Sequence, residues 1–264
     1  MTTPIARLVC TAHTTDEGGR LRVLGYRLTA RLADVSTNVS AEAVAAFEAK
    51  GAAAPGTMLA MPNGIDTKRF RPSDVARLEL RKREAVHEDE KVILAVGRLN
   101  EAKDYPNLFR AFADVLTRTG KVRLWVVGDG ELRKDLELEL ARLGIAAKVR
   151  FLGVQSNVAD WMNAADVFAL SSAWEGFGLV VAEAMACEKV VVATDAGGVK
   201  EVLGDCGYLV PTRNAVALGA ALKEALQLPP EAARALGQRA RERVVSQYSL
   251  ENVVRRWCAI YEGC

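Results

Sequence analysis

The stretch KVILAVGRLNEAKDYPNLFRAFADVLTR, residues 91–118, joins a short run rich in Val, Ile and Leu to a helical pattern of apolar residues. The same alternation recurs further along the chain. The later apolar runs are VRLWVVGDG (122–130), KVRFLGV (148–154), DVFALSS (166–172) and KVVVATD (189–195), and helical patterns follow them at 131–144, 158–165, 179–187 and 199–204. Nearly continuous apolar strands joined by helices are typical of a parallel sheet covered on both faces. The sequence therefore predicts an α/β fold with a doubly wound, Rossmann-like domain.

Glycines or small polar residues close every predicted strand. These closing residues are Gly97-Arg98, Gly128-Asp129-Gly130, Gly153, Ser171-Ser172 and Thr194-Asp195. An ordinary turn explains each of them when it is taken alone. In open parallel sheets, however, ligands bind outside the carboxyl ends of the strands. The joint occurrence of these glycines and small polar residues along one edge of the sheet therefore favours a binding cleft.

The segment EGFGLVVAE, residues 175–183, contains two carboxylates in an otherwise apolar run. Glu175 and Glu183 are separated by seven residues, so a path from a loop onto the second turn of a helix can bring both to one cleft. Gly176, Phe177, Gly178 and Leu179 lie where the loop meets the helix. Free backbone N–H groups at a helix amino terminus attract anions. The segment therefore predicts an anion-binding site.

The composition excludes several classes of protein. The 264 residues are 50% hydrophobic and 26% charged, which is typical of a globular chain. The formal net charge is only +2, so no overall attraction to nucleic acid is expected. Five widely spaced cysteines without a CxxC pair argue against a disulfide framework or a zinc site and favour a reducing cytoplasm. No apolar run is long enough to span a membrane, which leaves peripheral contact at its inner face open.

Six motifs, taken in order, resemble those of the retaining GT-B glycosyltransferases of family 4, the glycosyl transferases group 1. They are PNGID (62–66), GRLNEAKDYPNL (97–108), VVGDGELR (126–133), VRFLG (149–153), EGFGLVVAEAMA (175–186) and VATDAGGVKEVL (192–203). The resemblance covers roughly residues 62–262. The two glutamates in their EGFG setting form a specific signature, whereas the GDG turn alone is weak. The resemblance implies a GT-B fold and the transfer of a sugar, with retention of configuration, from a nucleotide diphosphate sugar to an acceptor hydroxyl.

The resemblance also assigns roles to the charged residues. Glu183 is expected to accept hydrogen bonds from the nucleotide ribose, and Glu175 is expected near the donor sugar. Arg98 and Lys103 match the paired cations that stabilise the leaving diphosphate. No obligatory cofactor and no metal ion is then expected, because cations already face the growing charge. The donor is a UDP-, GDP- or ADP-sugar, and the sequence leaves the base open.

Weaker matches supply the rest of the expected site. Gly128 and Gly130 resemble glycines of the donor cleft, although a tight turn explains them almost as well. Gly153 and Val154, at the end of Phe151–Val154, resemble the edge that packs the base. His13 stands where the family has a histidine near the reacting sugar. The acceptor is expected to be a carbohydrate or a lipid-linked molecule.

The resemblance divides the chain into three parts. Residues 1–61 are expected to form a partial acceptor domain, 62–245 the donor-binding domain, and 246–264 a helix that crosses back to the first part. Because the first part has few strands, a nucleotide-sugar-binding module or inactive fragment is the alternative to an enzyme, and self-association or a complementing chain is expected. A dehydrogenase is disfavoured, since the GDG turn lacks the full GxGxxG pattern.

Overall fold

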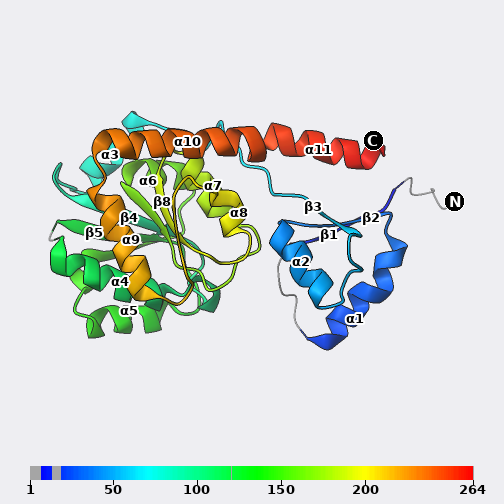
Figure 1. The fold of residues 1–264 in the computed structure, drawn as a ribbon. Coiled ribbons are helices and arrows are strands. Elements are labelled where there is room, and N and C mark those ends of the chain that lie inside the picture. The colour runs from blue at the N-terminus through cyan, green and yellow to red at the C-terminus, as the bar shows by residue number, and fades with distance from the viewer. Residues whose placement is uncertain (1–6, 14–18, 120, 264) are drawn as a thin grey trace.

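A six-stranded parallel sheet forms the centre of the larger part of the protein (Figure 1). The computed structural model describes residues 7–13, 19–119 and 121–263. The strands, in their order across the sheet, are β6 (Val149–Gly153), β5 (Val122–Val127), β4 (Lys91–Val96), β7 (Val167–Leu170), β8 (Val190–Thr194) and β9 (Tyr208–Val210). This is the strand order of a doubly wound Rossmann-like sheet. The α/β fold expected from the alternating pattern is confirmed.

Helices cover both faces of this sheet. On one face lie α3 (Asp74–Arg83), α6 (Val158–Ala164), α7 (Leu179–Ala186), α8 (Val199–Leu203) and α10 (Pro230–Tyr248). On the other face lie α4 (Tyr105–Arg118), α5 (Arg133–Arg142) and α9 (Ala215–Gln227). Short 3-10 helices occur at η2 (Glu101–Lys103) and η3 (Ala146–Lys148). The central strands β4, β7 and β8 are buried on both sides, and their sequences are accordingly apolar rather than alternating.

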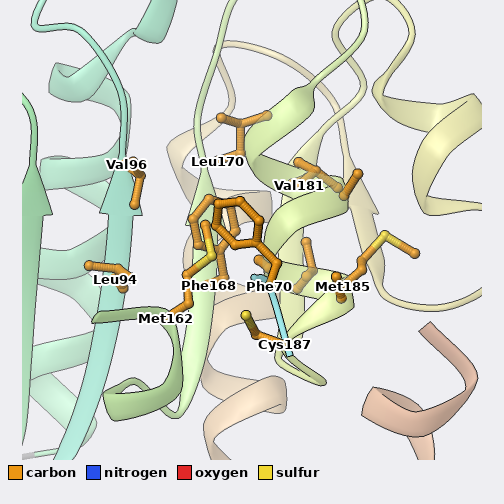
Figure 2. Packing of buried hydrophobic residues seen from close by; sticks show 14 of the residues in the cluster. Phe70, Leu94, Val96, Met162, Phe168, Leu170, Val181, Met185 and Cys187 are labelled. Atoms are coloured by element: carbon orange, nitrogen blue, oxygen red, sulfur yellow. The ribbon is translucent and has the colours of Figure 1, made fainter. Parts of the chain in front are cut away.

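Two apolar cores result from this arrangement. Along β4, Leu94 and Val96 point into one core, whereas Ile93 and Ala95 point into the other. Figure 2 shows part of the first core, where Phe168 of β7 and Val181 of α7 lie among its buried side chains. Successive side chains of a strand face opposite sides of the sheet. One apolar strand therefore anchors helices on both faces of the sheet.

A smaller unit contains a three-stranded parallel sheet with the order β1-β2-β3. Its elements are β1 (Val9–Ala12), α1 (Arg20–Thr29), η1 (Ala30–Leu32), β2 (Val35–Asn38), α2 (Ala41–Ala49) and β3 (Met58–Ala60). The core of this unit is small and centres on Phe47 and Met58, with Val23 and Tyr26 of α1 packed against it. The side chain of Ser40 caps α2 by accepting a hydrogen bond from the backbone N–H of Ala43 at 3.1 Å.

The last helices connect the two units along one side of the molecule (Figure 1). Helix α10 ends at Tyr248, and α11 (Leu250–Glu262) begins after Ser249, whose hydroxyl accepts from the backbone N–H of Asn252 at 3.4 Å. Ser249 therefore caps α11. Helix α11 extends over the small unit, where Arg256 donates to the carbonyl of Ala60 at 3.1 Å.

Some elements were not predicted from the sequence pattern. Strand β9 has only three residues and lies at the edge of the sheet, so it carries no long apolar run. Helix α3 has one buried residue, Leu80, and its remaining positions are mostly charged. Helix α9 lies in the second core, beyond the part of the chain in which the alternation was recognised.

Candidate active site

The two central strands, β4 and β7, run side by side, and the chain leaves them toward opposite edges of the sheet. Such a switch point opens a crevice at the carboxyl ends of the strands. Gly97 follows β4 at this rim, and Ser171 and Ser172 follow β7. The loops beyond them are linked, since the backbone N–H of Ala173 donates to the carbonyl of Ala102 at 2.8 Å. The predicted strand-end residues therefore do meet at one rim.

Two of the predicted cleft glycines are required by backbone packing. Gly128 has φ +133°, and a Cβ atom there would lie 2.0 Å from the carbonyl oxygen of Gly97. A Cβ atom on Gly130 would lie 2.5 Å from the carbonyl oxygen of Leu99. The N–H of Gly128 also donates to the carbonyl of Gly153 at 2.8 Å. These glycines hold the loops after β4, β5 and β6 against one another, which accounts for them without a ligand.

The EGFG loop packs equally tightly against the loop after β8. A Cβ atom on Gly197, whose φ is +58°, would lie 2.0 Å from the carbonyl oxygen of Glu175. Phe177 is buried and makes an edge contact with Tyr248, with ring centroids 5.5 Å apart. Gly178, with φ +85°, begins α7 without a side-chain cap, and the first turn of α7 has no acidic residue. A helix amino terminus without a side-chain cap or an acidic residue in its first turn favours the binding of an anion.

Lys103, Glu175 and Ser172 form a largely buried polar cluster at the rim. The Lys103 ammonium contacts Glu175 Oε1, and the hydroxyl of Ser172 donates to the same oxygen at 2.7 Å. The Lys103 and Glu175 side chains are only 18% and 14% exposed. The Ser171 hydroxyl donates to the backbone carbonyl of Lys103 at 2.7 Å and so fixes the segment that carries the lysine.

The structure brings Lys103 and Glu175 together but places Arg98 apart from this ion pair. Arg98 instead pairs with Glu131 at 3.3 Å, and both of these side chains are largely in solvent. An exposed pair of this kind is worth little and exchanges readily. The roles of Ser171 and Ser172 in the cluster were not assigned from the sequence. Their position directly after a buried strand and close before Glu175 is the signal that points to them.

Glu183 lies on the second turn of α7 and is partly buried. Burial raises its pKa to about 7, and the nearby Arg69 guanidinium only partly offsets this effect. Arg69 donates to the carbonyl of Ser156 at 2.8 Å, in the loop after β6. In that loop Val154 is exposed, as is Leu179 at the start of α7. A partly buried carboxyl group with a raised pKa is a candidate for a functional site.

The small unit contacts the EGFG loop directly. The carbonyl oxygen of His13 lies 2.5 Å from the point that a Cβ atom on Gly176 would occupy. The hydroxyl of Ser40 donates to the carbonyl of Gly176 at 3.0 Å. The N–H of Ala41 donates to the Glu201 carboxylate at 2.8 Å. The rim of the large sheet, from Lys103 to Gly198, therefore faces a second surface that includes His13 and the start of α2.

Among the residues that the structure describes, no group of His, Cys, Asp or Glu side chains is arranged to hold a metal ion. Over the same residues, no helix has the length and apolar character needed to cross a membrane.

The sequence matches the model of the family described as glycosyl transferases group 1 over residues 76–243. The chain belongs to this family. It is 35% identical over 204 residues to N-acetyl-alpha-D-glucosaminyl L-malate synthase of Bacillus anthracis, covering 75% of this chain and 52% of that protein. It is 36% identical over 212 residues to D-inositol 3-phosphate glycosyltransferase of Rhodococcus erythropolis, covering 76% and 47%. The chain spans about half the length of these curated relatives.

Solved structures show that this group 1 glycosyltransferase chain has the GT-B fold. HepE of Anabaena, in complex with UDP and glucose, matches with a TM-score of 0.87 and 24% identity over 96% of this chain and 71% of that one. Sucrose-phosphate synthase of Thermosynechococcus elongatus matches with a TM-score of 0.86 and 26% identity over 97% and 67%. The resemblance expected from the six motifs is thus confirmed at the level of family and fold.

Proposed function

We propose that the chain is the donor-binding part, with some of the acceptor side, of a retaining family 4 glycosyltransferase. The reaction moves a sugar from a nucleotide diphosphate donor to an acceptor hydroxyl. The observation that carries this proposal is the cluster of Lys103, Glu175 and Ser172 at the topological switch point, beside the uncapped amino terminus of α7. Cations, free N–H groups and a carboxylate at one rim suit a sugar diphosphate.

The diphosphate lies between α7 and the two basic residues in this proposal. The N–H groups that follow Gly178 donate to its oxygens, and Lys103 and Arg98 face it. As the glycosidic bond breaks, negative charge grows on the leaving group, so preplaced cations stabilise the transition state more than the ground state. Lys103 must exchange part of its contact with Glu175 for the phosphate oxygens. Ser172 keeps Glu175 oriented toward the donor sugar during that exchange.

The nucleoside occupies the crevice next to the diphosphate. Glu183 accepts hydrogen bonds from the ribose hydroxyls, for which its two oxygens are suited once the carboxyl group is ionised. The base lies at the loop after β6, formed by Gly153 and Val154, with Gly128 and Gly130 shaping the floor. UDP is the first nucleotide to test, because a structure with the same fold contains it. GDP and ADP are the comparisons.

The acceptor enters between the rim and the small unit, where His13 and Gly176 are close. In the three-part division proposed for the chain, residues 1–61 supply this side, 62–245 hold the donor, and 246–264 cross back. The acceptor proposed for this chain is a carbohydrate or a lipid-linked molecule with a free hydroxyl group. Two relatives are named for chemically different molecules, L-malate and inositol 3-phosphate, so their names do not narrow this choice. The described cysteines Cys10, Cys187, Cys206 and Cys258 are all free, which supports a cytoplasmic location.

Calorimetric titration with UDP, GDP, ADP and the matching nucleosides tests the donor site. Lys103→Ala and Arg98→Ala should weaken binding of the diphosphates by roughly 1–3 kcal/mol each while changing binding of the nucleosides little, because only the former carry the charge that these residues face. Lys68→Ala, at an exposed ion pair with Glu251, is the matched control. Equal losses of affinity for diphosphate and nucleoside would indicate a packing defect and contradict the diphosphate-binding role of Lys103 and Arg98.

A nucleotide-sugar-binding module is the second candidate, because the described acceptor-side sheet has only three strands. Incubation with labelled nucleotide sugars and a panel of acceptor alcohols distinguishes the two. Labelled product with several turnovers supports the transferase, and nucleotide binding without any product supports the module.

A further inference from the structure

The EGFG loop, residues 175–178, is enclosed by close contacts from both units. On the side of the small unit, a Cβ atom on Gly176 would lie 2.5 Å from the carbonyl oxygen of His13 and 3.4 Å from Val39 Cγ2. On the side of the large unit, a Cβ atom on Gly198 would lie 2.7 Å from the carbonyl oxygen of Gly176. A side chain therefore fits at neither glycine, and the loop is held between the two units.

Val39 and Ser40, the two residues before α2, make this contact from the small unit. Val39 is 1% exposed and belongs to the same buried apolar cluster as Phe177 of the EGFG loop. Ser40 is buried to the same extent. Its hydroxyl accepts from the backbone N–H of Ala43 at 3.1 Å and donates to the carbonyl of Gly176 at 3.0 Å. One hydroxyl group therefore caps α2 and also bonds the EGFG loop.

The position of Ser40 is fixed by the large unit as well. The N–H of Ala41 donates to the Glu201 carboxylate at 2.8 Å, which ties the start of α2 to α8. A Cβ atom on Gly198, directly before α8, would lie 2.8 Å from the Ser40 Cβ atom. An N-cap serine needs only the acceptor lone pairs of its hydroxyl for the helix. The hydrogen bond from Ser40 to Gly176 is therefore additional to the cap, and capping alone does not account for it.

This hydrogen bond also sets the direction of the next N–H group of the loop. The peptide unit between Gly176 and Phe177 is trans, so its C=O and N–H point in opposite directions. Because the carbonyl of Gly176 is directed at Ser40, the N–H of Phe177 is directed away from it. Phe177 immediately precedes Gly178, with which α7 begins. Ser40 thus controls the orientation of a backbone donor next to the helix start that is proposed to bind the diphosphate.

We propose that Ser40 is a positioning residue of the donor site, which holds the EGFG loop from the small unit so that its backbone can bind a nucleotide diphosphate. This inference rests on the proposed function, in which the loop carries Glu175 and leads into α7. Ser40 itself does not touch the donor. Its effect passes through the Gly176 carbonyl, and the small unit thereby contributes to the donor side of the site as well as to the acceptor side.

Nuclear magnetic relaxation of the backbone amides tests the contact without any ligand. Ser40→Ala and Ser40→Gly both remove the hydroxyl that donates to Gly176. In each variant the order parameters of the Gly176, Phe177 and Gly178 amides should fall by at least about 0.1 from the roughly 0.85 of a rigid backbone. Ser40→Gly separates this effect from capping, because glycine replaces an N-cap serine at little cost to the helix.

Ser73 provides the matched control for the loss of a helix cap. Its hydroxyl caps α3 by accepting from the N–H of Ala76 at 3.2 Å, in a part of the large unit away from the EGFG loop. Ser73→Ala should therefore leave the order parameters of the loop unchanged. Circular dichroism of every variant checks that the fold persists.

Calorimetric titration tests the consequence for binding. The probe is whichever of UDP, GDP and ADP the wild type binds most tightly, titrated beside its own nucleoside. Ser40→Ala and Ser40→Gly should weaken binding of the diphosphate by about fivefold, the loss of roughly one net hydrogen bond, and change binding of the nucleoside by less than about twofold. Only the diphosphate meets the loop in the proposed site. Ser73→Ala should change neither affinity.

Two results would overturn the role of Ser40 alone. They are loop order parameters that are the same in Ser40→Gly and in the wild type, and losses of affinity that are equal for the diphosphate and the nucleoside. Failure of the wild type to bind any of the three diphosphates would overturn the donor site and this inference with it. That failure is distinguishable, because it is seen before any residue is substituted.

Discussion

At the scale of single residues, the surroundings of a carboxyl group decide its chemistry more than its identity does. Glu175 contacts a lysine and a serine, whereas Glu183 is partly buried near the Arg69 guanidinium and has a pKa raised to about 7. Two glutamates of one short segment therefore lie in different surroundings. In the donor site proposed above, hydrogen bonds from ribose hydroxyls to Glu183 would favour its ionised form.

The raised pKa of Glu183 makes stability depend on pH. Its pKa rises from 4.5 in an exposed carboxyl group to about 7, so the folded state holds this proton more tightly than the unfolded state does. That contribution is complete below about pH 4.5 and is lost as the pH rises through 7. Glu183→Gln removes the titration. We expect the variant and the wild type to differ least at low pH, and the variant to gain about 1–3 kcal/mol over the wild type above pH 8.

Urea unfolding of the two proteins at a series of pH values measures this difference. Glu48→Gln is a control, because Glu48 lies on α2 outside the crevice and accepts from the backbone of Gly56. A stability difference between Glu183→Gln and wild type that stays constant with pH would contradict the assignment of the raised pKa.

At the scale of elements, the rim depends on backbones that approach more closely than a side chain allows. Gly128, with φ +133°, has the Gly97 carbonyl oxygen 2.0 Å from the position of a Cβ atom. We expect Gly128→Ala to destabilise the protein by more than about 3 kcal/mol, because steric overlap adds to the strained backbone. Gly144→Ala is the matched control: φ is +69° there, but nothing lies within 4 Å. Gly144→Ala should lower the free energy of unfolding by only about 1 kcal/mol.

Thermal or urea unfolding of both glycine variants provides the comparison. If both variants lose a similar amount of stability, backbone strain at the glycine explains the effect. The close packing of the loops after β4 and β5 would then contribute nothing.

At the scale of the whole molecule, hydrogen bonds between distant elements join the small unit to the large one. The start of α2 rests on the donor rim through Ser40 and Gly176 and through Ala41 and Glu201, and Arg256 of α11 reaches Ala60. We expect Glu201→Ala to leave the large sheet unchanged and to raise amide hydrogen exchange in α2 by about tenfold, the loss of roughly one hydrogen bond to a charged group. The backbone amides of β4 and β5 should keep their wild-type protection from hydrogen exchange.

Hydrogen exchange followed by mass spectrometry measures the protection of α2 and of the large sheet in one experiment. Glu251→Ala, which breaks only an exposed ion pair with Lys68, should change neither region. Equal loss of protection in α2 and in the large sheet would show that the two units unfold as one.

The local pattern of the sequence was enough to predict the larger sheet and the family. Apolar runs such as KVILAV, each followed by a helical pattern, require a parallel sheet with two covered faces, and the EGFG segment marks the start of a helix beside a strand end. Strand β9 was not predicted, because three residues at a sheet edge leave too weak a periodic signal.

Contacts between distant parts of the chain were decided only by the tertiary structure. Ser171 and Lys103 are 68 residues apart in sequence and meet because β4 and β7 are neighbours at the switch point. The pairing of Arg98 with Glu131 rather than with the cluster depends likewise on where the loop after β5 lies. Helix α1 shows the same limit: its periodicity contains two apolar faces, and only the packing of Val23 and Tyr26 determines that the other face, which includes Leu21, is left in solvent. Periodicity is a property of neighbours along the chain, whereas burial depends on what the rest of the fold places against them.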